Sequence, residues 1–254
     1  MFQDYGAKID TGCKWKNMKY SIRADSIRKA MAQNNFEIIE SYFGTNISQL
    51  KILEIGTGVG NLAFLLAQNS PLYQGIEQSK EHYNQAISDF PNLKGKVLNC
   101  SLENANFKSN YFDLIIMIDL LEHVYFPQYL LQQTKRYLKR TGVLYLQIPN
   151  EDWFIFRAHV RKLLGGYSRY PTNPGHVNLF TIRSLKKMLE MTNLGIQKST
   201  QLTVLSDYGR VKIIFGFKFL FLAKLVCIFF KITKLDILLN QGNFSLFLKK
   251  FSSA

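Results

Sequence analysis

Three glycines at alternate positions form a segment whose spacing suits a ligand-binding turn. Gly56, Gly58 and Gly60 follow an apolar run, and Asn61 begins a stretch with helical periodicity. Glycines at a strand-to-helix turn let the backbone approach a ligand closely, and the first turn of a helix favours polar or anionic groups. A dinucleotide fingerprint requires a glycine where this chain has Asn61. The turn therefore predicts a ligand without a pyrophosphate.

Glu77 has the residue type and the position expected of a partner for a ribose. It closes the next apolar segment, Tyr73–Glu77, and a carboxylate at a strand end can accept hydrogen bonds from both ribose hydroxyls of an adenosine. On its own, a solvated acid at a strand end is the better explanation. Beside the glycine turn at this spacing, ribose recognition is favoured.

A second polar group suits proton transfer or metal binding. Asp119, Glu122 and His123 follow an apolar run, and His176 lies farther along the chain. The carboxyl ends of strands are where open α/β sheets bind ligands. A histidine can remove a proton near neutral pH, and a divalent cation can instead lower the pKa of a bound hydroxyl. A purely structural role for Glu122 and His123 at the start of a helix is a third alternative.

These residues need a scaffold of alternating strands and helices, and the sequence predicts one. Apolar runs alternate with helical periodicity from residue 51 onward, which implies βαβ crossovers and a parallel sheet. A helix over 21–43 precedes them and ends at Gly44, and Thr141 with Gly142 and later Gly195 are read as helix stops. The predicted strands are 51–55, 73–77, 96–101, 112–119, 143–148 and 244–249, and the helices between them are 61–68, 80–90, 127–140 and 181–191.

The combination resembles the class I S-adenosylmethionine-dependent methyltransferases. The resemblance implies a doubly wound, mostly parallel α/β sheet of seven strands whose last strand is antiparallel. It divides the chain into an N-terminal helical segment, 1–45, and a methyltransferase domain, 46–254. The segments that carry it are Glu54–Gly60, Gly75–Glu77, Ser101–Phe107 and Phe112–Val124, and Gly175–Thr181 is similar to the branch that includes ubiquinone-type O-methyltransferases.

The resemblance also implies the cofactor S-adenosylmethionine and a set of residues that bind it. Many relatives have an aspartate where this chain has Ser101, so adenine recognition would depend on Ser101, Leu102 and backbone groups. The full set comprises Glu54, Gly56, Gly58, Gly60, Glu77, Ser101, Leu102 and Asp119.

For the second polar group, the resemblance leaves two mechanisms open. The arrangement is similar to the Glu-x-x-Glu-His…His metal sites of some ubiquinone-pathway and small-RNA 2′-O-methyltransferases, with Asp119 replacing the first glutamate. In one mechanism Asp119, Glu122, His123 and His176 hold Mg²⁺, Mn²⁺ or Zn²⁺. In the other, His123 or His176, with Glu122, acts as a metal-free catalytic base.

Two segments after residue 150 are expected near the methyl acceptor. Residues 151–180 are rich in aromatic side chains and are predicted to cap the acceptor pocket, and residues 207–240 form an apolar, basic insertion before the last strand. Lys218 and Lys224 make a membrane-spanning helix costly. An apolar face flanked by basic side chains over 210–234 fits either an interfacial membrane helix or a buried lid.

Composition and charge narrow the class of protein. Hydrophobic content of 47% and charged content of 20% in 254 residues exclude a disordered chain. Residues 51–125 hold five lysines and eight carboxylates, whereas residues 126–254 hold twenty lysines and arginines and five carboxylates. The basic half predicts an anionic partner such as lipid headgroups, a phosphorylated substrate or RNA, unless the whole composition is simply basic.

Localisation follows from the thiols and the first residues. Three scattered cysteines match no metal spacing, and the N-terminal residues lack the apolar stretch of a signal peptide. A cytoplasmic protein is expected, with peripheral attachment to a membrane if the 207–240 insertion binds lipid.

The predicted function is methyl transfer from S-adenosylmethionine to an oxygen of a small, lipid-linked or glycan-linked acceptor. Charge favours an RNA methyltransferase as the alternative, although no RNA-binding module is evident. A non-catalytic S-adenosylmethionine-binding protein at a membrane is the third reading. The sequence predicts neither the acceptor nor the oligomeric state.

Overall fold

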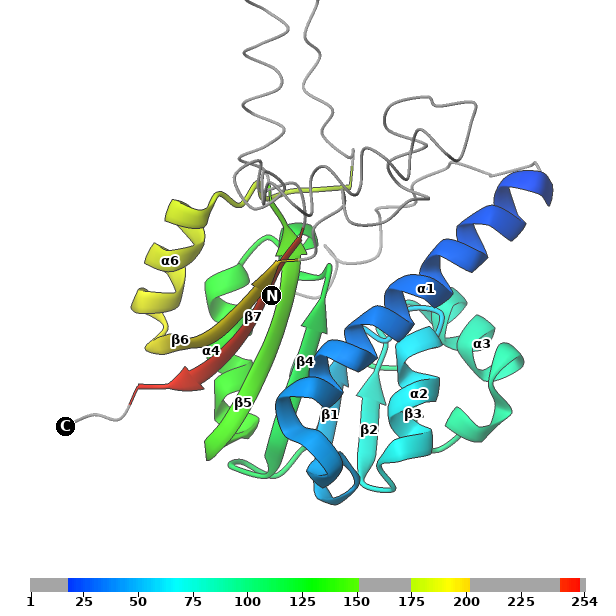
Figure 1. Cartoon of the computed structure of the whole chain (residues 1–254), viewed down its shortest axis with the longest axis horizontal. Coiled ribbons are helices and arrows are strands. Elements are labelled where there is room, and N and C mark those ends of the chain that lie inside the picture. Colours follow the sequence, from blue (N-terminus) through cyan, green and yellow to red (C-terminus); the bar gives the residue numbers. More distant parts are fainter. Residues whose placement is uncertain (1–17, 151–174, 202–242, 252–254) are drawn as a thin grey trace, which may run out of the picture. The chain divides into compact units, whose positions relative to one another are not determined.

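The computed structural model describes residues 18–150, 175–201 and 243–251 (Figure 1). Most of the predicted acceptor cap, 151–180, and all of the basic insertion, 207–240, lie outside the described residues. None of the helices in the described ranges is long and apolar enough to cross a membrane.

The strands form one mixed sheet of seven, in the order β3-β2-β1-β4-β5-β7-β6. Strands β1, β2 and β3 are parallel, and β7 is antiparallel to both β5 and β6. The predicted seven-stranded sheet with an antiparallel last strand is therefore confirmed. The bounds are β1 Ile52–Ile55, β2 Tyr73–Ile76, β3 Val97–Leu98, β4 Phe112–Ile118, β5 Leu138–Pro149, β6 Leu194–Gln201 and β7 Asn243–Lys250.

The helices begin and end at recognisable signals. Ser79 caps α3, since its hydroxyl accepts from the His82 N–H, and Thr181 and Ser184 form a capping box on α6. The α-helices are α1 Met18–Phe43, α2 Asn61–Asn69, α3 Lys80–Asp89, α4 Pro127–Tyr137 and α6 Ile182–Met191, and the 3₁₀ turns are η1 Gly44–Gln49, η2 Pro91–Leu93, η3 Leu102–Asn104 and η4 Leu121–His123.

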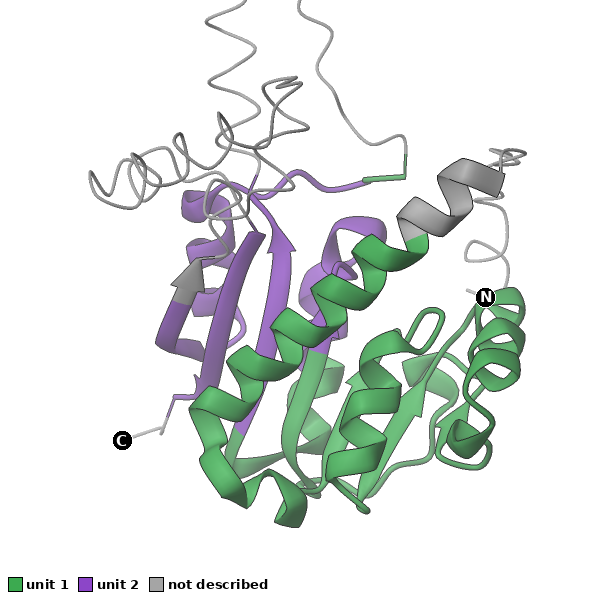
Figure 2. Ribbon diagram, turned by 45° about the vertical axis from the view of Figure 1, so that its right-hand side comes forward, with its two compact units in different colours: residues 1–116, 133–142, 173–176 green, residues 117–132, 143–172, 177–254 purple. Residues whose placement is uncertain are grey.

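The chain groups into two compact units (Figure 2). Unit 1 comprises residues 1–116, 133–142 and 173–176, and unit 2 comprises residues 117–132, 143–172 and 177–254.

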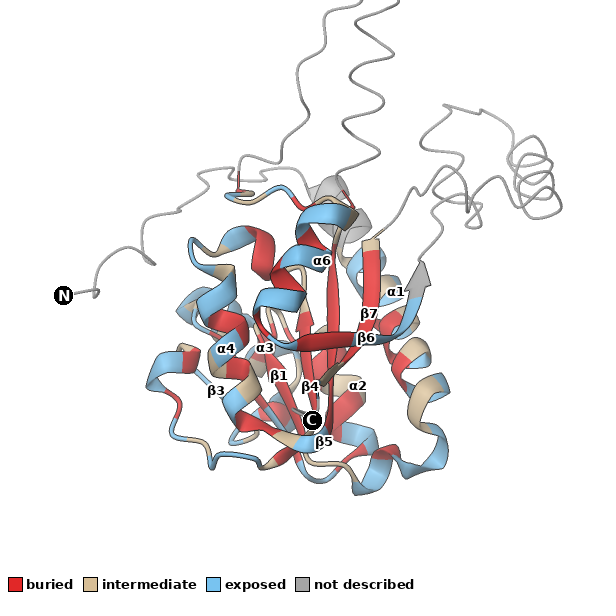
Figure 3. Ribbon diagram, turned by 90° about the vertical axis from the view of Figure 1, so that its left-hand side faces the viewer, coloured by how far each residue is buried: buried red, intermediate tan, exposed pale blue. Residues whose placement is uncertain are grey.

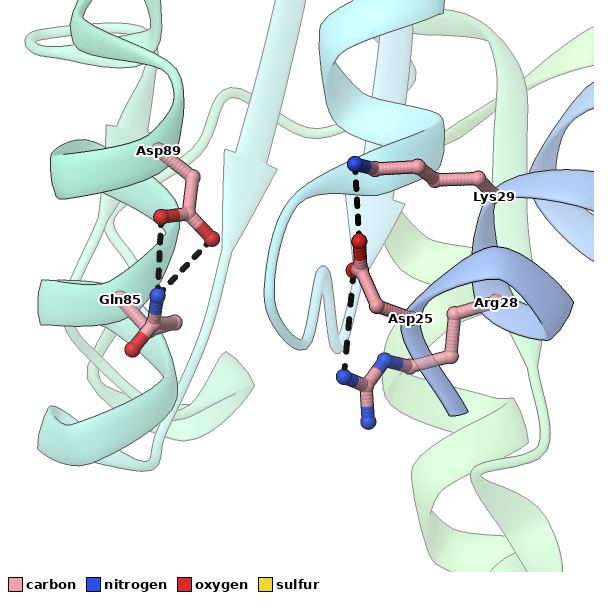
Figure 4. Close-up of polar contacts among 5 residues, drawn as sticks. All are labelled: Asp25, Arg28, Lys29, Gln85 and Asp89. Carbon is pink, nitrogen blue, oxygen red and sulfur yellow. Dashed lines mark hydrogen bonds and ion pairs between the residues drawn. The ribbon is translucent and has the colours of Figure 1, made fainter. Parts of the chain in front are cut away.

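Unit 1 holds β1, β2 and β3, and in it α1 packs against α2. All four residues of β1 are buried, as a strand covered on both faces requires. Its polar contacts include surface pairs, such as Lys29 to Asp25 at 2.8 Å on α1 and Gln85 to Asp89 on α3 (Figure 4). Such exposed pairs add little stability, so apolar burial holds this unit together.

The core of unit 2 lies along β5 and β7. Residues 143–148 of β5 and 244–248 of β7 are buried (Figure 3). The rings of Tyr145 and Phe247, which pair across the two strands, have centroids 4.9 Å apart. The last strand is therefore a central structural element of unit 2.

Two predicted boundaries were wrong around α4. The helix ends at Tyr137 rather than Arg140, and Gly142 lies inside β5. The N–H groups of Asn110 and Tyr111 donate to the Arg136 and Tyr137 carbonyls, and these bonds replace the next helical turn. A side chain at Gly142 would lie 2.9 Å from the Phe112 carbonyl, so this glycine permits close strand packing.

The predicted role of Gly195 was also wrong. Helix α6 ends at Met191, and Asn193, with φ 53°, takes the left-handed conformation after it. Gly195 belongs to β6, where a Cβ atom would lie 2.8 Å from the Phe251 ring. Strand β3 is also shorter than the predicted 96–101.

Candidate active site

The glycine turn connects β1 to α2 in a conformation that glycine adopts readily. Gly56, Gly58 and Gly60 all have positive φ, between 54° and 86°. Gly60 is the N-cap of α2, and a Cβ atom there would lie 2.9 Å from the Ala86 Cβ. The three predicted glycines therefore shape one turn, in which Gly58 has open space around it.

Glu77 lies against this turn. Its Oε2 accepts from the Gly58 N–H at 2.7 Å, and its Oε1 accepts from the Ser79 N–H at 2.8 Å. Asn99 holds the backbone, because its side-chain amide donates to the Glu77 carbonyl at 2.7 Å. A carboxylate has about four acceptor positions, so two remain for other donors. The structure thus places Glu77 with the glycine turn.

Glu54 is a buried acid within the predicted cofactor set. The Tyr73 hydroxyl donates to its Oε2 at 2.7 Å, and the Glu54 residue is only 4% exposed. Burial raises the pKa of Glu54 to about 8, against the lowering effect of the Tyr73 hydrogen bond, and the charge of Glu77 raises it further. Glu54 is therefore a neutral acid at pH 7, held by Tyr73 under the turn.

Three further residues of unit 1 differ in what they could offer a ligand. Ser101 is half-buried and precedes η3, whereas the Leu102 side chain is almost fully buried, so Leu102 offers a ligand mainly its backbone. Sequence reasoning missed Thr57, whose buried hydroxyl has no hydrogen-bond partner within the described part of the chain. Its position between two turn glycines was the available signal.

Asp119 follows β4 in unit 2 with an unusual backbone conformation. Its φ is 47°, which is uncommon for a residue with a side chain. Its N–H donates to the Gln147 carbonyl at 3.0 Å, and its Oδ1 accepts from the Asn243 amide at 3.1 Å. Burial raises the pKa of Asp119 to about 6, and the charge of His123 acts in the opposite direction. Sequence reasoning missed Asn243.

Glu122 and His123 lie together in η4 of unit 2. Glu122 is 1% exposed and His123 Nε2 lies 3.9 Å from Glu122 Oε1, while 40% of the His123 side chain is exposed. The Glu122 carbonyl accepts from the Val177 N–H at 2.8 Å and from the Asn178 N–H at 3.0 Å. Since Val177 is bonded covalently to His176, the chain that carries this histidine is anchored at η4.

Each unit holds one group of the candidate site residues. Unit 1 has a hydrogen-bond acceptor, Glu77, at the glycine turn, and unit 2 has the ionisable side chains that follow β4. His123 is accessible to solvent and has the Glu122 carboxylate beside it, a pairing of residue types that general acid–base catalysis uses. Of the four predicted metal ligands, Asp119 already accepts from Asn243. His82 is exposed on α3.

Comparisons with known proteins agree with this fold. A family model described as "Methyltransferase domain" matches residues 27–199. The ubiquinone biosynthesis O-methyltransferase of Haemophilus ducreyi is 28% identical over 122 residues. That match covers 45% of this chain and 50% of the relative, so this chain spans about half the length of that protein.

Solved structures with similar folds are more distant in sequence. Phosphoethanolamine N-methyltransferase 2 of Haemonchus contortus, in complex with phosphomonomethylethanolamine and S-adenosylhomocysteine, has a TM-score of 0.54 and 19% identity; the match covers 86% of this chain and 52% of that one. Magnesium protoporphyrin IX methyltransferase of Synechocystis, with bound S-adenosylhomocysteine, has a TM-score of 0.53 and 16% identity, covering 66% and 76%. At these identities the similarity establishes the fold.

Proposed function

Since the chain belongs to the methyltransferase domain family, we propose that it transfers the methyl group of S-adenosylmethionine to an oxygen of a small or lipid-linked acceptor. One observation carries the cofactor assignment. The Glu77 carboxylate, held by the Gly58 and Ser79 N–H groups, keeps acceptor positions for two ribose hydroxyls at the glycine turn. Both solved relatives named above bind S-adenosylhomocysteine, which supports the same cofactor here.

The remaining cofactor contacts follow from the turn. Gly58 leaves open space beside its backbone, and backbone N–H groups at the start of α2 can face the polar methionine part of the cofactor. Ser101 and the Leu102 backbone would contact the adenine, and Asp119 belongs to the same proposed cofactor-binding set.

In the proposed reaction, the acceptor oxygen attacks the sulfonium methyl carbon as the carbon–sulfur bond breaks, which leaves S-adenosylhomocysteine. The proton of the acceptor hydroxyl moves to His123 or His176. Glu122, 3.9 Å from His123, would hold the imidazole and stabilise its charged form.

A divalent cation is the second catalytic alternative. Glu122, His123 and His176 have ligand types that suit Zn²⁺ or Mn²⁺, and Asp119 could offer its Oδ2, because the contact with Asn243 uses only Oδ1. A bound cation would lower the pKa of the acceptor hydroxyl. These residues would then hold the cation rather than take the proton.

The acceptor class and the membrane role remain proposals with separate support. O-methylation is supported by the Haemophilus ducreyi relative, whose name specifies it. A lipid-linked acceptor and peripheral membrane attachment are supported by the basic, apolar residues 207–240.

Calorimetry with S-adenosylhomocysteine tests the proposed function directly. We expect micromolar binding, about −8 kcal/mol, and no comparable binding of NAD. Mass spectrometry of small molecules from cells with and without the protein should then identify a product heavier by one methylene. Preference for NAD, or cofactor binding without any methylated product, would contradict the proposal.

A further inference from the structure

Gln147 is a polar side chain in the interior of unit 2 with unmet hydrogen-bonding capacity. It lies on β5 and is 0% exposed. Within the described residues, neither its Oε1 nor its Nε2 has a hydrogen-bond partner. Buried side-chain amides are almost always hydrogen-bonded in folded proteins, so an unmet one requires an explanation.

The neighbours of Gln147 on the sheet are known from the strand register. Alternate residues of a strand share a face, so Tyr145 and Pro149 flank Gln147 on its side of β5. Ser245 of β7 lies directly opposite Gln147, and Phe247 lies opposite Tyr145. The amide therefore lies between an aromatic pair on one side and the carboxyl end of β5, two residues away, on the other.

Polar groups of unit 2 gather at that end of the strand. The Gln147 carbonyl accepts from the Asp119 N–H, and Asp119 Oδ1 accepts from Asn243, which pairs with Pro149. The charge of Asp119 also influences Tyr145, which is on the same face of the sheet as Gln147. Burial raises the pKa of Tyr145 to about 12, a hydrogen bond with Ser245 lowers it, and the Asp119 charge raises it further.

We propose that Gln147 is a specificity-determining residue for the methyl acceptor, whose uncharged hydroxyl or carbonyl group hydrogen-bonds its side-chain amide. This inference rests on the proposed methyl transfer and adds the class of acceptor. An amide can donate from Nε2 and accept at Oε1, which matches a hydroxyl that does both. The amide is two residues from the carboxyl end of β5, and Asn243, which pairs with Pro149 at that end, also holds Asp119.

The charge of these neighbours favours an uncharged acceptor group. None of the side chains described around Gln147 carries a positive charge at neutral pH. Asp119 is an acid, and Asn243, Ser245 and Tyr145 are uncharged polar groups. A phosphate or carboxylate beside the amide would lose its hydration, and the described polar groups around Gln147 offer it no positive charge, since the charge of His123 acts on Asp119. A phenol, quinol or sugar hydroxyl loses less hydration free energy on burial, and a hydrogen bond with the Gln147 amide compensates for that loss.

The first test uses the ligand-free protein and Gln147→Met, which keeps an unbranched side chain but removes both hydrogen-bonding atoms. Because the wild-type amide is buried and unmet, this variant should melt about 2–4 °C higher than the wild type. Gln74→Met, at an exposed position on β2, is the matched control and should not melt higher. A Gln147→Met midpoint at or below that of the wild type would overturn the inference, because it would mean that the amide is satisfied without a ligand.

The second test measures acceptor binding with catechol, which is uncharged, and 3,4-dihydroxybenzoate, which has the same hydroxyls and a carboxylate. Millimolar catechol, added to the protein saturated with S-adenosylhomocysteine, should raise the melting midpoint of the wild type and of Gln74→Met. It should have a several-fold smaller effect on Gln147→Met, and the benzoate should have little effect on any of the three.

The outcomes separate this inference from the proposed function. S-adenosylhomocysteine should bind the wild type and Gln147→Met within about twofold, below about 0.4 kcal/mol. If the wild type does not bind it, the proposed function fails. If it binds but catechol has no effect, or affects Gln147→Met and the wild type equally, or if the benzoate is preferred, the assignment of Gln147 to an uncharged acceptor is wrong.

Discussion

The Gly58 N–H donates to the Glu77 carboxylate at 2.7 Å, which joins the glycine turn to the end of β2. The two residues were expected to bind one ligand from separate segments, and the structure links them before any ligand is considered. The ribose-binding acid is thus fixed by the turn that it serves. A variant of Glu77 should therefore affect both cofactor affinity and the order of the turn.

Glu77→Ala should weaken S-adenosylhomocysteine binding by about 1.5–3 kcal/mol, the usual contribution of hydrogen bonds to a charged group. Glu77→Gln should lose less binding free energy than Glu77→Ala, since its amide oxygen can still accept from the Gly58 N–H. Titration calorimetry measures both, with Glu81→Gln on the exposed face of α3 as control. Wild-type affinity in Glu77→Ala would remove Glu77 from the cofactor site.

Gly60→Ala should destabilise the protein more than Gly95→Ala does. Both glycines have positive φ, so each alanine costs about 1–2 kcal/mol in backbone strain. At Gly60 the new Cβ would also overlap Ala86 and Leu93, whereas nothing lies within 4 Å at Gly95. The overlap should add about 1–3 kcal/mol. Urea unfolding gives the difference, and equal losses would contradict the packing described for the turn.

Glu54 should make the protein less stable as the pH rises. Its pKa of about 8 in the folded chain exceeds the value of about 4.3 expected when unfolded. The folded state therefore keeps a proton that the unfolded state releases, and stability falls between these two values by up to about 1.4 kcal/mol per pH unit.

Glu54→Gln should flatten this dependence, because the amide is neutral throughout and can still accept from the Tyr73 hydroxyl. Asp119, with a pKa of about 6, leaves a slope of the same sign over a narrower pH range, from about 3.9 upward. Unfolding free energies at several pH values provide the comparison, with Glu81→Gln as control. A slope unchanged in Glu54→Gln would mean that Glu54 is ionised in the folded protein.

His123→Ala or His176→Ala should lower the methyl-transfer rate by about 10²–10⁴-fold if a histidine is the base, with no effect of chelators. If a cation is used, chelation should abolish activity, and Mg²⁺, Mn²⁺ or Zn²⁺ should restore it while the cofactor stays bound. His82→Ala, on the exposed surface of α3, is the control. Full activity in both variants and in chelator would leave only proximity as the catalytic effect.

If residues 210–234 bind a membrane, the protein should co-sediment with anionic liposomes at low salt and less so at high salt. Each basic residue near the surface contributes about 1 kcal/mol, and salt screens that attraction. Neutral liposomes are the control. Equal recovery in the supernatant under all conditions would assign the segment to the lid instead.

The sequence predicted the elements that have a clear periodicity or cap. The glycine turn, the apolar run of β4 and the Thr181 cap were all located correctly. Strand β6 was not located, because only its first two residues, Leu194 and Gly195, are buried over 194–199. A strand that pairs on one side and faces solvent has little apolar pattern to detect.

The remaining site residues were missed because tertiary contacts define them. Gln147 looks like one polar residue in an apolar strand, and its importance comes from the register with Ser245. Asn243 precedes the predicted last strand, and only folding brings it to Asp119, 124 positions away. The helix stop at Asn193 was assigned to Gly195 because glycine is the commoner residue at such positions.

The pairing of β6 has a consequence for synthesis on the ribosome. Its partner is β7, which begins at Asn243, so a ribosome making about 5–20 residues per second needs several seconds between completing one strand and supplying the other. During that interval both sides of β6 and the free side of β5 expose unpaired backbone groups, which other chains could join. A nascent-chain chaperone, or slow local translation after residue 201, would therefore change the yield of folded protein without changing its final stability.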